Sequence, residues 1–133
     1  MLKFAVLVTS FGLLALAGGC EKTAIEGPGG KKLTLSKPAD QTIKRGETND
    51  VKVSVSRTNF RDAVAVRFEN LPAGVTVQDK DRKIAAEENS ATFTLHAAPD
   101  AAIVSNQEVK VTVVGPDGMS VMESFKLNVK DKG

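Results

Sequence analysis

The chain has 133 residues and a formal net charge of +2, with six Phe, one Cys and no Trp or Tyr. This length is typical of a single domain. A charge so close to neutral gives no support to nucleic-acid binding, which needs a clustered basic face, and one thiol excludes an internal disulfide. Valine is abundant in the body of the chain, and β-branched side chains favour strands over helices.

Residues 1–19 are expected to be an export signal. Lys3 gives a positive start, and residues 4–17 form an uncharged, mainly apolar run of about 14 residues, within the range of a secretory signal. As a helix this run would span roughly 21 Å, which is too short for the hydrocarbon core of a bilayer. We therefore expect an N-terminal signal helix rather than a transmembrane anchor.

The sequence "LAGGC" at residues 16–20 resembles the lipobox of bacterial lipoproteins. The resemblance implies cleavage between Gly19 and Cys20 and attachment of diacylglycerol to the Cys20 thiol. Two or more acyl chains would hold the protein stably at a membrane. The alternative is an ordinary secretory signal cut after residues 15–17, which would leave a free thiol near the new N-terminus.

The resemblance also bears on localisation. In such signals an Asp after the cysteine often retains the protein at the inner membrane, so Glu21 favours the outer membrane of a bacterial envelope. Which face of that membrane the protein occupies stays open. Residues 20–31 centre on "GPGG" at 27–30, and because Gly and Pro interrupt regular structure, we expect the lipidated cysteine to be followed by a flexible tether.

From residue 32 to residue 130 the apolar side chains alternate with polar ones, which is the period of a half-buried strand. Turn residues separate the strands, and "GPDG" at 115–118 predicts a hairpin. Two sheets packed face to face would bury all the apolar faces, so we expect a seven-stranded antiparallel sandwich over 32–130. The inward residues of the seven strands are Leu33 and Leu35; Val51, Val53 and Val55; Val64, Val66 and Phe68; Val75 and Val77; Phe93 and Leu95; Val109, Val111 and Val113; and Val121, Phe125, Leu127 and Val129.

This region resembles the Ig-like modules of bacterial envelope and secreted proteins. The resemblance rests on a valine-rich strand after a Gly turn, on "LPAGV" at 71–75, and on "AAPDAA" at 97–102. It implies an all-β Ig-like fold and is silent on activity. The antibody pattern is absent, because residues 32–130 have no Cys pair, no Trp and no Tyr.

Candidates for chemistry are few. His96 is the single histidine, and no "GxSxG" elbow accompanies any serine, so we expect no catalysis. Asp79 and Asp81 have the oxygens that Ca²⁺ prefers, but neighbouring basic side chains oppose them and favour a solvated, charge-balanced loop. Whether this loop binds an ion stays open, and no metal, cofactor or nucleic acid is expected.

Among the aromatic side chains of the body, Phe60 alone lies in a turn where its ring could be exposed, and it is flanked by Arg57 and Arg61. These three residues are possible ligand contacts; the alternative is that Phe60 closes one end of the core. The sequence thus predicts a membrane-anchored structural or protein-interaction module of the envelope, with an envelope protein as its partner. The alternative is an accessory binding module for polysaccharide or peptidoglycan.

Overall fold

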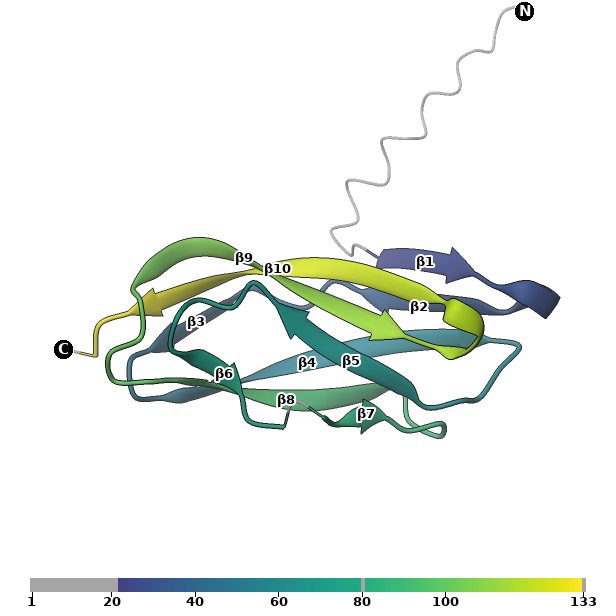
Figure 1. Ribbon diagram of the computed structural model, residues 1–133, viewed down its shortest axis with the longest axis horizontal. Coiled ribbons are helices and arrows are strands. Elements are labelled where there is room, and N and C mark those ends of the chain that lie inside the picture. Colours follow the sequence, from purple (N-terminus) through teal and green to yellow (C-terminus); the bar gives the residue numbers. More distant parts are fainter. Residues whose placement is uncertain (1–21, 80, 133) are drawn as a thin grey trace, which may run out of the picture.

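The computed structural model describes residues 22–79 and 81–132, so the expected signal helix over 1–19, the cleavage site and Cys20 lie outside the described residues. Within those residues ten strands and two short 3-10 turns form an elongated, all-β molecule (Figure 1). The elements are β1 (Lys22–Glu26), η2 (Pro28–Gly30), β2 (Lys32–Ser36), β3 (Gln41–Lys44), β4 (Thr48–Thr58), β5 (Val64–Glu69), β6 (Val75–Val77), β7 (Lys83–Ile84), β8 (Ser90–Ala97), β9 (Val104–Val114), η3 (Pro116–Gly118) and β10 (Ser120–Lys130).

The strands form two sheets, with the orders β1-β2-β4-β8-β6 and β3-β10-β9-β5-β7. The run β2-β4-β8-β6 has the order of strands A, B, E and D of an immunoglobulin domain, and β10-β9-β5 has that of G, F and C. The chain crosses between sheets after β2, and β3 then runs parallel to β10, whereas the other pairs are antiparallel. The strand order therefore confirms an Ig-like sandwich.

All seven expected strands are present, as β2, β4, β5, β6, β8, β9 and β10, and their apolar faces form the core. Fully buried examples are Leu33, Val51 and Leu127. Phe68 from one sheet meets Phe93 from the other edge to face, with ring centroids 5.3 Å apart. Each such buried side chain contributes about 1.5–3 kcal/mol, so the stability comes from packing between the sheets.

The expected number of seven strands is too low, because β1, β3 and β7 lie outside the alternating pattern. β7 has two residues and β3 has four, with Ile43 as the one buried side chain of β3. Every residue of β1 is exposed. A strand that is held by backbone hydrogen bonds at a sheet margin needs no apolar face, so hydrophobic periodicity misses it.

The expected flexible tether is also wrong for residues 22–31. β1 pairs with β2 in antiparallel register from Lys22↔Ser36 to Glu26↔Lys32. The turn between them repeats the β9–β10 turn: the N–H of Gly27 donates to the carbonyl of Lys31, as the N–H of Gly115 does to Met119. The glycines of "GPGG" thus close a hairpin, and Lys22, the first described residue, already lies in a strand.

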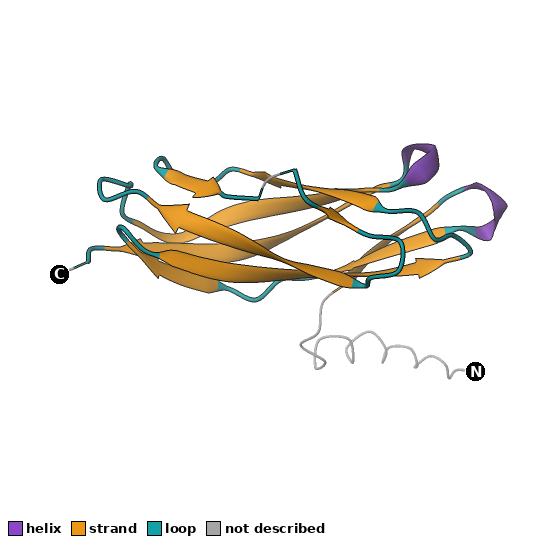
Figure 2. Cartoon of the chain, turned by 90° about the horizontal axis from the view of Figure 1, so that it is seen from below, coloured by secondary structure: helices purple, strands orange, loops and turns teal. Residues whose placement is uncertain are grey.

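β1 also closes one side of the sandwich. It lies along β10, where Thr23 Oγ1 donates to Glu123 Oε2 at 2.5 Å. Gly27 lies so close to Met119 that an added Cβ would be 2.7 Å from its sulfur. Figure 2 shows the two turns at the same end of the molecule. The hairpin of β1 and β2 therefore spans the margins of both sheets.

The two motifs of the Ig-like resemblance meet in space. The N–H of Ala98 donates to the carbonyl of Gly74 at 2.9 Å, and that of Ala102 donates to Ala73 at 2.9 Å. Gly74 has a φ of +86°, and an added Cβ would lie 2.7 Å from the Cα of Ala101. Glycine is required here both by the left-handed backbone and by the close approach.

The crossover between β2 and β3 is fastened to β10 by polar groups. Lys37 Nζ donates to the carbonyl of Ser124 at 2.8 Å, and the N–H of Lys126 donates to Asp40 Oδ1 at 2.9 Å. This backbone hydrogen bond, aided by the nearby Lys37 ammonium, holds the pKa of Asp40 below its ordinary value of 3.8. The charged carboxylate of Asp40 therefore fastens the segment in which the chain crosses from one sheet to the other.

Candidate functional site

The first candidate site is a hollow at the end of the sandwich that carries the two hairpin turns. It has a volume of about 520 Å³ and lies between the β4–β5 loop and the segment before β8. Arg57, Phe60 and Arg61 line it together with Glu87 and Asn89. The structure thus brings together the three residues that the sequence singled out as possible ligand contacts.

Arg57 has a structural role in this hollow. Its guanidinium donates to four backbone carbonyls: from Nε to Asp62 at 2.9 Å, from Nη1 to Glu88 at 2.6 Å, and from Nη2 to Ile84 at 3.1 Å and Ala85 at 2.9 Å. These bonds occupy most of the five N–H donors of an arginine. Arg57 therefore ties the β4–β5 loop to the segment before β8 and shapes the hollow.

Phe60 and Arg61 occupy different environments. The ring of Phe60 is half-buried and packs against the core, so it both closes this end of the core and lines the hollow. Arg61 is exposed and makes no side-chain hydrogen bond or ion pair among the described residues. Of the three predicted contacts, Phe60 and Arg61 are the two that present groups to a ligand.

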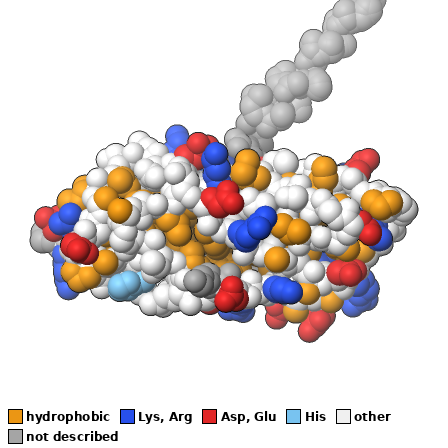
Figure 3. All heavy atoms as spheres, in the orientation of Figure 1, with side chains coloured by type: hydrophobic (Ala, Val, Ile, Leu, Met, Phe, Trp, Pro, Cys, Tyr) orange, Lys and Arg blue, Asp and Glu red, His pale blue; other side chains and the backbone are white. Residues whose placement is uncertain are grey.

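The second candidate site is an opening on the long side of the sandwich, between β5 and β6. A hollow of about 310 Å³ is lined mainly by apolar residues, namely Phe68, Leu71, Val75 and Val77, together with Thr76. Figure 3 shows hydrophobic side chains inside the opening on this face. The two sheets therefore leave part of the apolar core reachable from solvent here.

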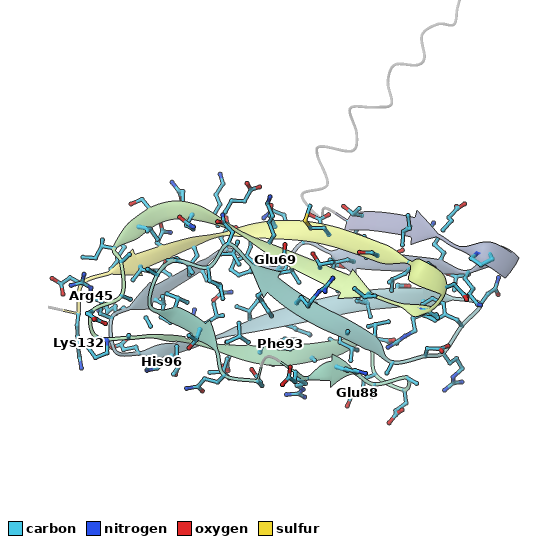
Figure 4. The ribbon with its side chains drawn as sticks, viewed as in Figure 1. Arg45, Glu69, Glu88, Phe93, His96 and Lys132 are labelled. Carbon is cyan, nitrogen blue, oxygen red and sulfur yellow. The ribbon has the colours of Figure 1, made fainter. Side chains whose placement is uncertain are left out.

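A second space flanks the same strand. It measures about 360 Å³ and is lined by Arg67, Phe68, Glu69 and Asp81, so Phe68 borders both spaces. In Figure 4, Glu69 lies on β5 above the opening, whereas Phe93 and His96 lie on β8 of the other sheet. We refer to this side, from Val66–Glu69 of β5 to Val75–Val77 of β6, as the open side.

The open side exposes unpaired strand edges. β7 pairs with Val64 and Ala65 alone, so Val66–Glu69 has no strand beyond it among the described residues. β6 is the last strand of the other sheet and has three residues. Unpaired edges present backbone N–H and C=O groups that can bind an extended chain.

Sequence reasoning missed the open side. Phe68, Val75 and Val77 were expected to be core residues. Val75 and Val77 are buried in the core, whereas Phe68 is partly buried and packs against it, and periodicity does not show which sheet margin stays uncovered. That depends on the shortness of β6 and β7 and on the path of the chain between them. The usable signal was the short, Gly- and Pro-bounded "VTV" at 75–77, because a short strand suits a sheet margin.

The other sequence candidates lie apart from both hollows or serve the fold. His96 is half-buried on β8, where its partners in register are Thr48 and Thr76. The carboxylate of Asp79 accepts the backbone N–H of Thr94 at 3.1 Å and lies 4.0 Å from Arg82. Asp79 thus fastens its loop to β8, while Asp81 borders the open side.

Residues 22–79 and 81–132 contain neither a candidate metal centre nor a helix that could span a membrane. No three His, Cys, Asp or Glu side chains gather there in a way that suits a metal ion. In the same residues no helix has the length and apolar character needed to cross a bilayer.

The sequence matches no known family model and no curated protein. Among solved structures, the chain is similar to a chimeric titin Z1Z2 functionalised with a KLER peptide from decorin (TM-score 0.44, 12% identity, 85% of this chain and 98% of that chain). It is also similar to the titin M3 domain (0.45, 11%, 84% and 98%) and to domains 4 and 5 of the S-layer protein SbsC (0.42, 15%, 87% and 79%). At these scores the likenesses add nothing to the Ig-like strand order described above.

Proposed function

We propose that this chain is a lipid-anchored, non-catalytic interaction module of the bacterial envelope, and that it binds a protein partner through the open side. The observation that carries the proposal is the hollow beside the unpaired edge of β5, with Phe68, Leu71 and Val75 in its lining. An extended chain bound there would gain backbone hydrogen bonds from the edge and would cover exposed apolar surface.

The proposed anchor fits this arrangement. If lipid is attached to Cys20, Lys22 of β1 follows within two residues, a reach of at most about 7 Å. β1 and β10 lie at one margin of the sandwich, whereas β5 and β6 lie at the other. A short link at the first margin would keep that margin near the bilayer and leave the open side, at the opposite margin, uncovered by the membrane.

Crosslinking in cells tests the proposal. A photo-crosslinking amino acid placed at Leu71, inside the hollow, is expected to give a protein adduct. The matched control is the same amino acid at Met122, an apolar residue that is 48% exposed on β10, and it is expected to give none. No adduct from Leu71, or equal adducts from both positions, would contradict a binding role for the open side.

The anchor needs its own test. In cells fed radioactive palmitate, the parent chain is expected to be labelled and to fractionate with outer membranes, and Cys20→Ser is expected to be unlabelled. Equal labelling of Cys20→Ser would contradict the lipobox interpretation. An unlabelled parent chain cut after residue 17 would favour the secretory alternative.

The second candidate function is binding of polysaccharide or peptidoglycan at the hollow beside Phe60 and Arg61. It is favoured by one observation, the half-buried Phe60 ring that lines a hollow of about 520 Å³ next to an exposed cation. Retention on immobilised peptidoglycan that is lost in Phe60→Ala and kept in Leu71→Ala would support it. No retention of the parent chain would exclude it.

A further inference from the structure

We infer that the partner bound at the open side is a second copy of this chain, paired with the first in antiparallel fashion through the β5 edges. The inference rests on the proposed function and names the partner of that same site. It would join the two five-stranded sheets that contain β5 into one continuous sheet across a two-fold axis.

The sequence of the free edge is complementary to itself. Arg67 and Glu69 are both exposed and project from the same face of β5, while Phe68 between them points toward the core. If two copies pair antiparallel with Phe68 opposite Phe68, each Arg67 lies opposite the Glu69 of the other copy. Two ion pairs then form across the axis, and opposite charges at such positions stabilise a strand pair.

The neighbouring strand continues this pattern. Within one copy, Glu69 lies in register with Lys110 of β9, and Arg67 lies in register with Thr112. In the dimer each Glu69 would lie between two basic residues, Lys110 of its own chain and Arg67 of the other. In the extended sheet each Glu69 would therefore have a basic side chain on the strand to either side of it.

The length of the free edge fits a short, well-defined pairing. β7 covers Val64 and Ala65, and β5 ends at Glu69, before the backbone turns at Asn70 with a φ of +65°. Pairing about Phe68 matches Arg67 with Glu69 of the other copy on both sides of the axis, so the register uses uncovered residues of β5. The two spaces beside Phe68, of about 310 and 360 Å³, leave room for the second strand and its side chains.

Other strand margins are less suited to this role. The outer margin of β1 lies against β10, where Thr23 donates to Glu123, and the free edge of β3 lies beside β4, where Asn49 Nδ2 donates to the carbonyl of Thr42. β6 has a free edge of three residues with no charge to fix a register. Edge strands that avoid pairing commonly carry charged side chains, Lys above all. The two charges on the free edge of β5 have opposite signs, so they attract each other across an antiparallel pair.

Charge reversal tests the inference in the full chain, solubilised in a nonionic detergent and sized by sedimentation equilibrium. The parent chain is expected to dimerise. Arg67→Glu and Glu69→Arg each place two like-charged pairs across the axis, so each is expected to weaken the dimer by about tenfold or more. A mixture of the two variants is expected to form heterodimers, and the double variant R67E/E69R is expected to dimerise like the parent chain.

Each outcome has one meaning. Recovery in the mixture and in the double variant would support the pairing, and it cannot arise from misfolding of a single variant. A parent chain that is monomeric up to its solubility limit would overturn the inference, as would a dimer that neither single variant weakens. If Leu71 then crosslinks to a different protein in cells, the proposed function stands while the self-pairing is rejected.

Discussion

Lys31 Nζ lies 2.6 Å from Asp117 Oδ2 and joins the turn of the β1–β2 hairpin to that of the β9–β10 hairpin. The hydrogen bond and the charge of Asp117 raise the pKa of Lys31. The same turn is held from a third direction, because Asn59 Nδ2 donates to the carbonyl of Gly30 at 2.9 Å. A segment that reads as a linker is therefore fastened to two other loops.

The first prediction concerns this ion pair. Asp117→Asn removes the charge but keeps a residue that tolerates the φ of +58° at this position. We expect a small decrease in melting temperature at low salt and none at high salt, since exposed pairs are screened. Thermal melts followed by circular dichroism measure this difference, and an equal decrease at both salt concentrations would show that the bond is not ionic in effect.

A second prediction concerns Gly74. Gly74→Ala introduces a Cβ 2.7 Å from the backbone of Ala101 and forces a left-handed φ on alanine. We expect the free energy of unfolding to fall by about 2 kcal/mol or more. Gly118→Ala is the matched control, because its φ of +75° is similar but an added Cβ meets nothing within 4 Å. The control should lose about 1 kcal/mol, and equal losses would show that the close approach is unimportant.

A third prediction separates the two arginines of the first hollow. Arg57→Gln removes most of the donors to the carbonyls of Asp62, Glu88, Ile84 and Ala85, so we expect a loss of about 2–3 kcal/mol in urea unfolding. Arg61→Gln should change stability by less than about 0.5 kcal/mol. Similar effects of the two variants would contradict the structural role of Arg57.

A fourth prediction gives a pH dependence. The pKa of Asp40 is lower in the folded chain than in the unfolded chain. The ionised carboxylate therefore adds its full contribution to the free energy of unfolding above the unfolded pKa, and this contribution is lost as the pH falls through the folded pKa. Asp40→Asn should therefore cost up to about 1 kcal/mol at neutral pH, a small value because the carboxylate is largely exposed. Unfolding measured at decreasing pH should show this difference shrink below pH 3.8. If the difference in unfolding free energy between the parent chain and Asp40→Asn stayed constant with pH, it would come from packing and not from the charge of Asp40.

The sequence predicts the sheets better than their margins. The seven alternating strands and the "GPDG" hairpin are all present, because burial of one strand face imposes period two on the chain. β1 has no such face, yet "GPGG" at 27–30 has the same Gly-Pro-x-Gly spacing as the hairpin turn at 115–118. Comparing the two turns is the one signal in the sequence that could have located the extra strand.

The candidate sites were likewise predictable from the sequence only in part. Arg57, Phe60 and Arg61 are neighbours in the sequence, so their meeting at one hollow could be foreseen. The four carbonyls that Arg57 bonds include three that come from a distant segment, Ile84, Ala85 and Glu88, and alternation says nothing about these. The open side likewise depends on which distant strand fails to cover β5.

The most direct test of the account is hydrogen exchange of the full chain in detergent, measured at low and high protein concentration. We predict that the amides of Lys22–Glu26 that pair with β2 are protected at both concentrations. We also predict that the amides of Val66–Glu69 that face away from β9 become protected at the high concentration alone. Fast exchange throughout Lys22–Glu26, or exchange at Val66–Glu69 that does not depend on concentration, would contradict the account.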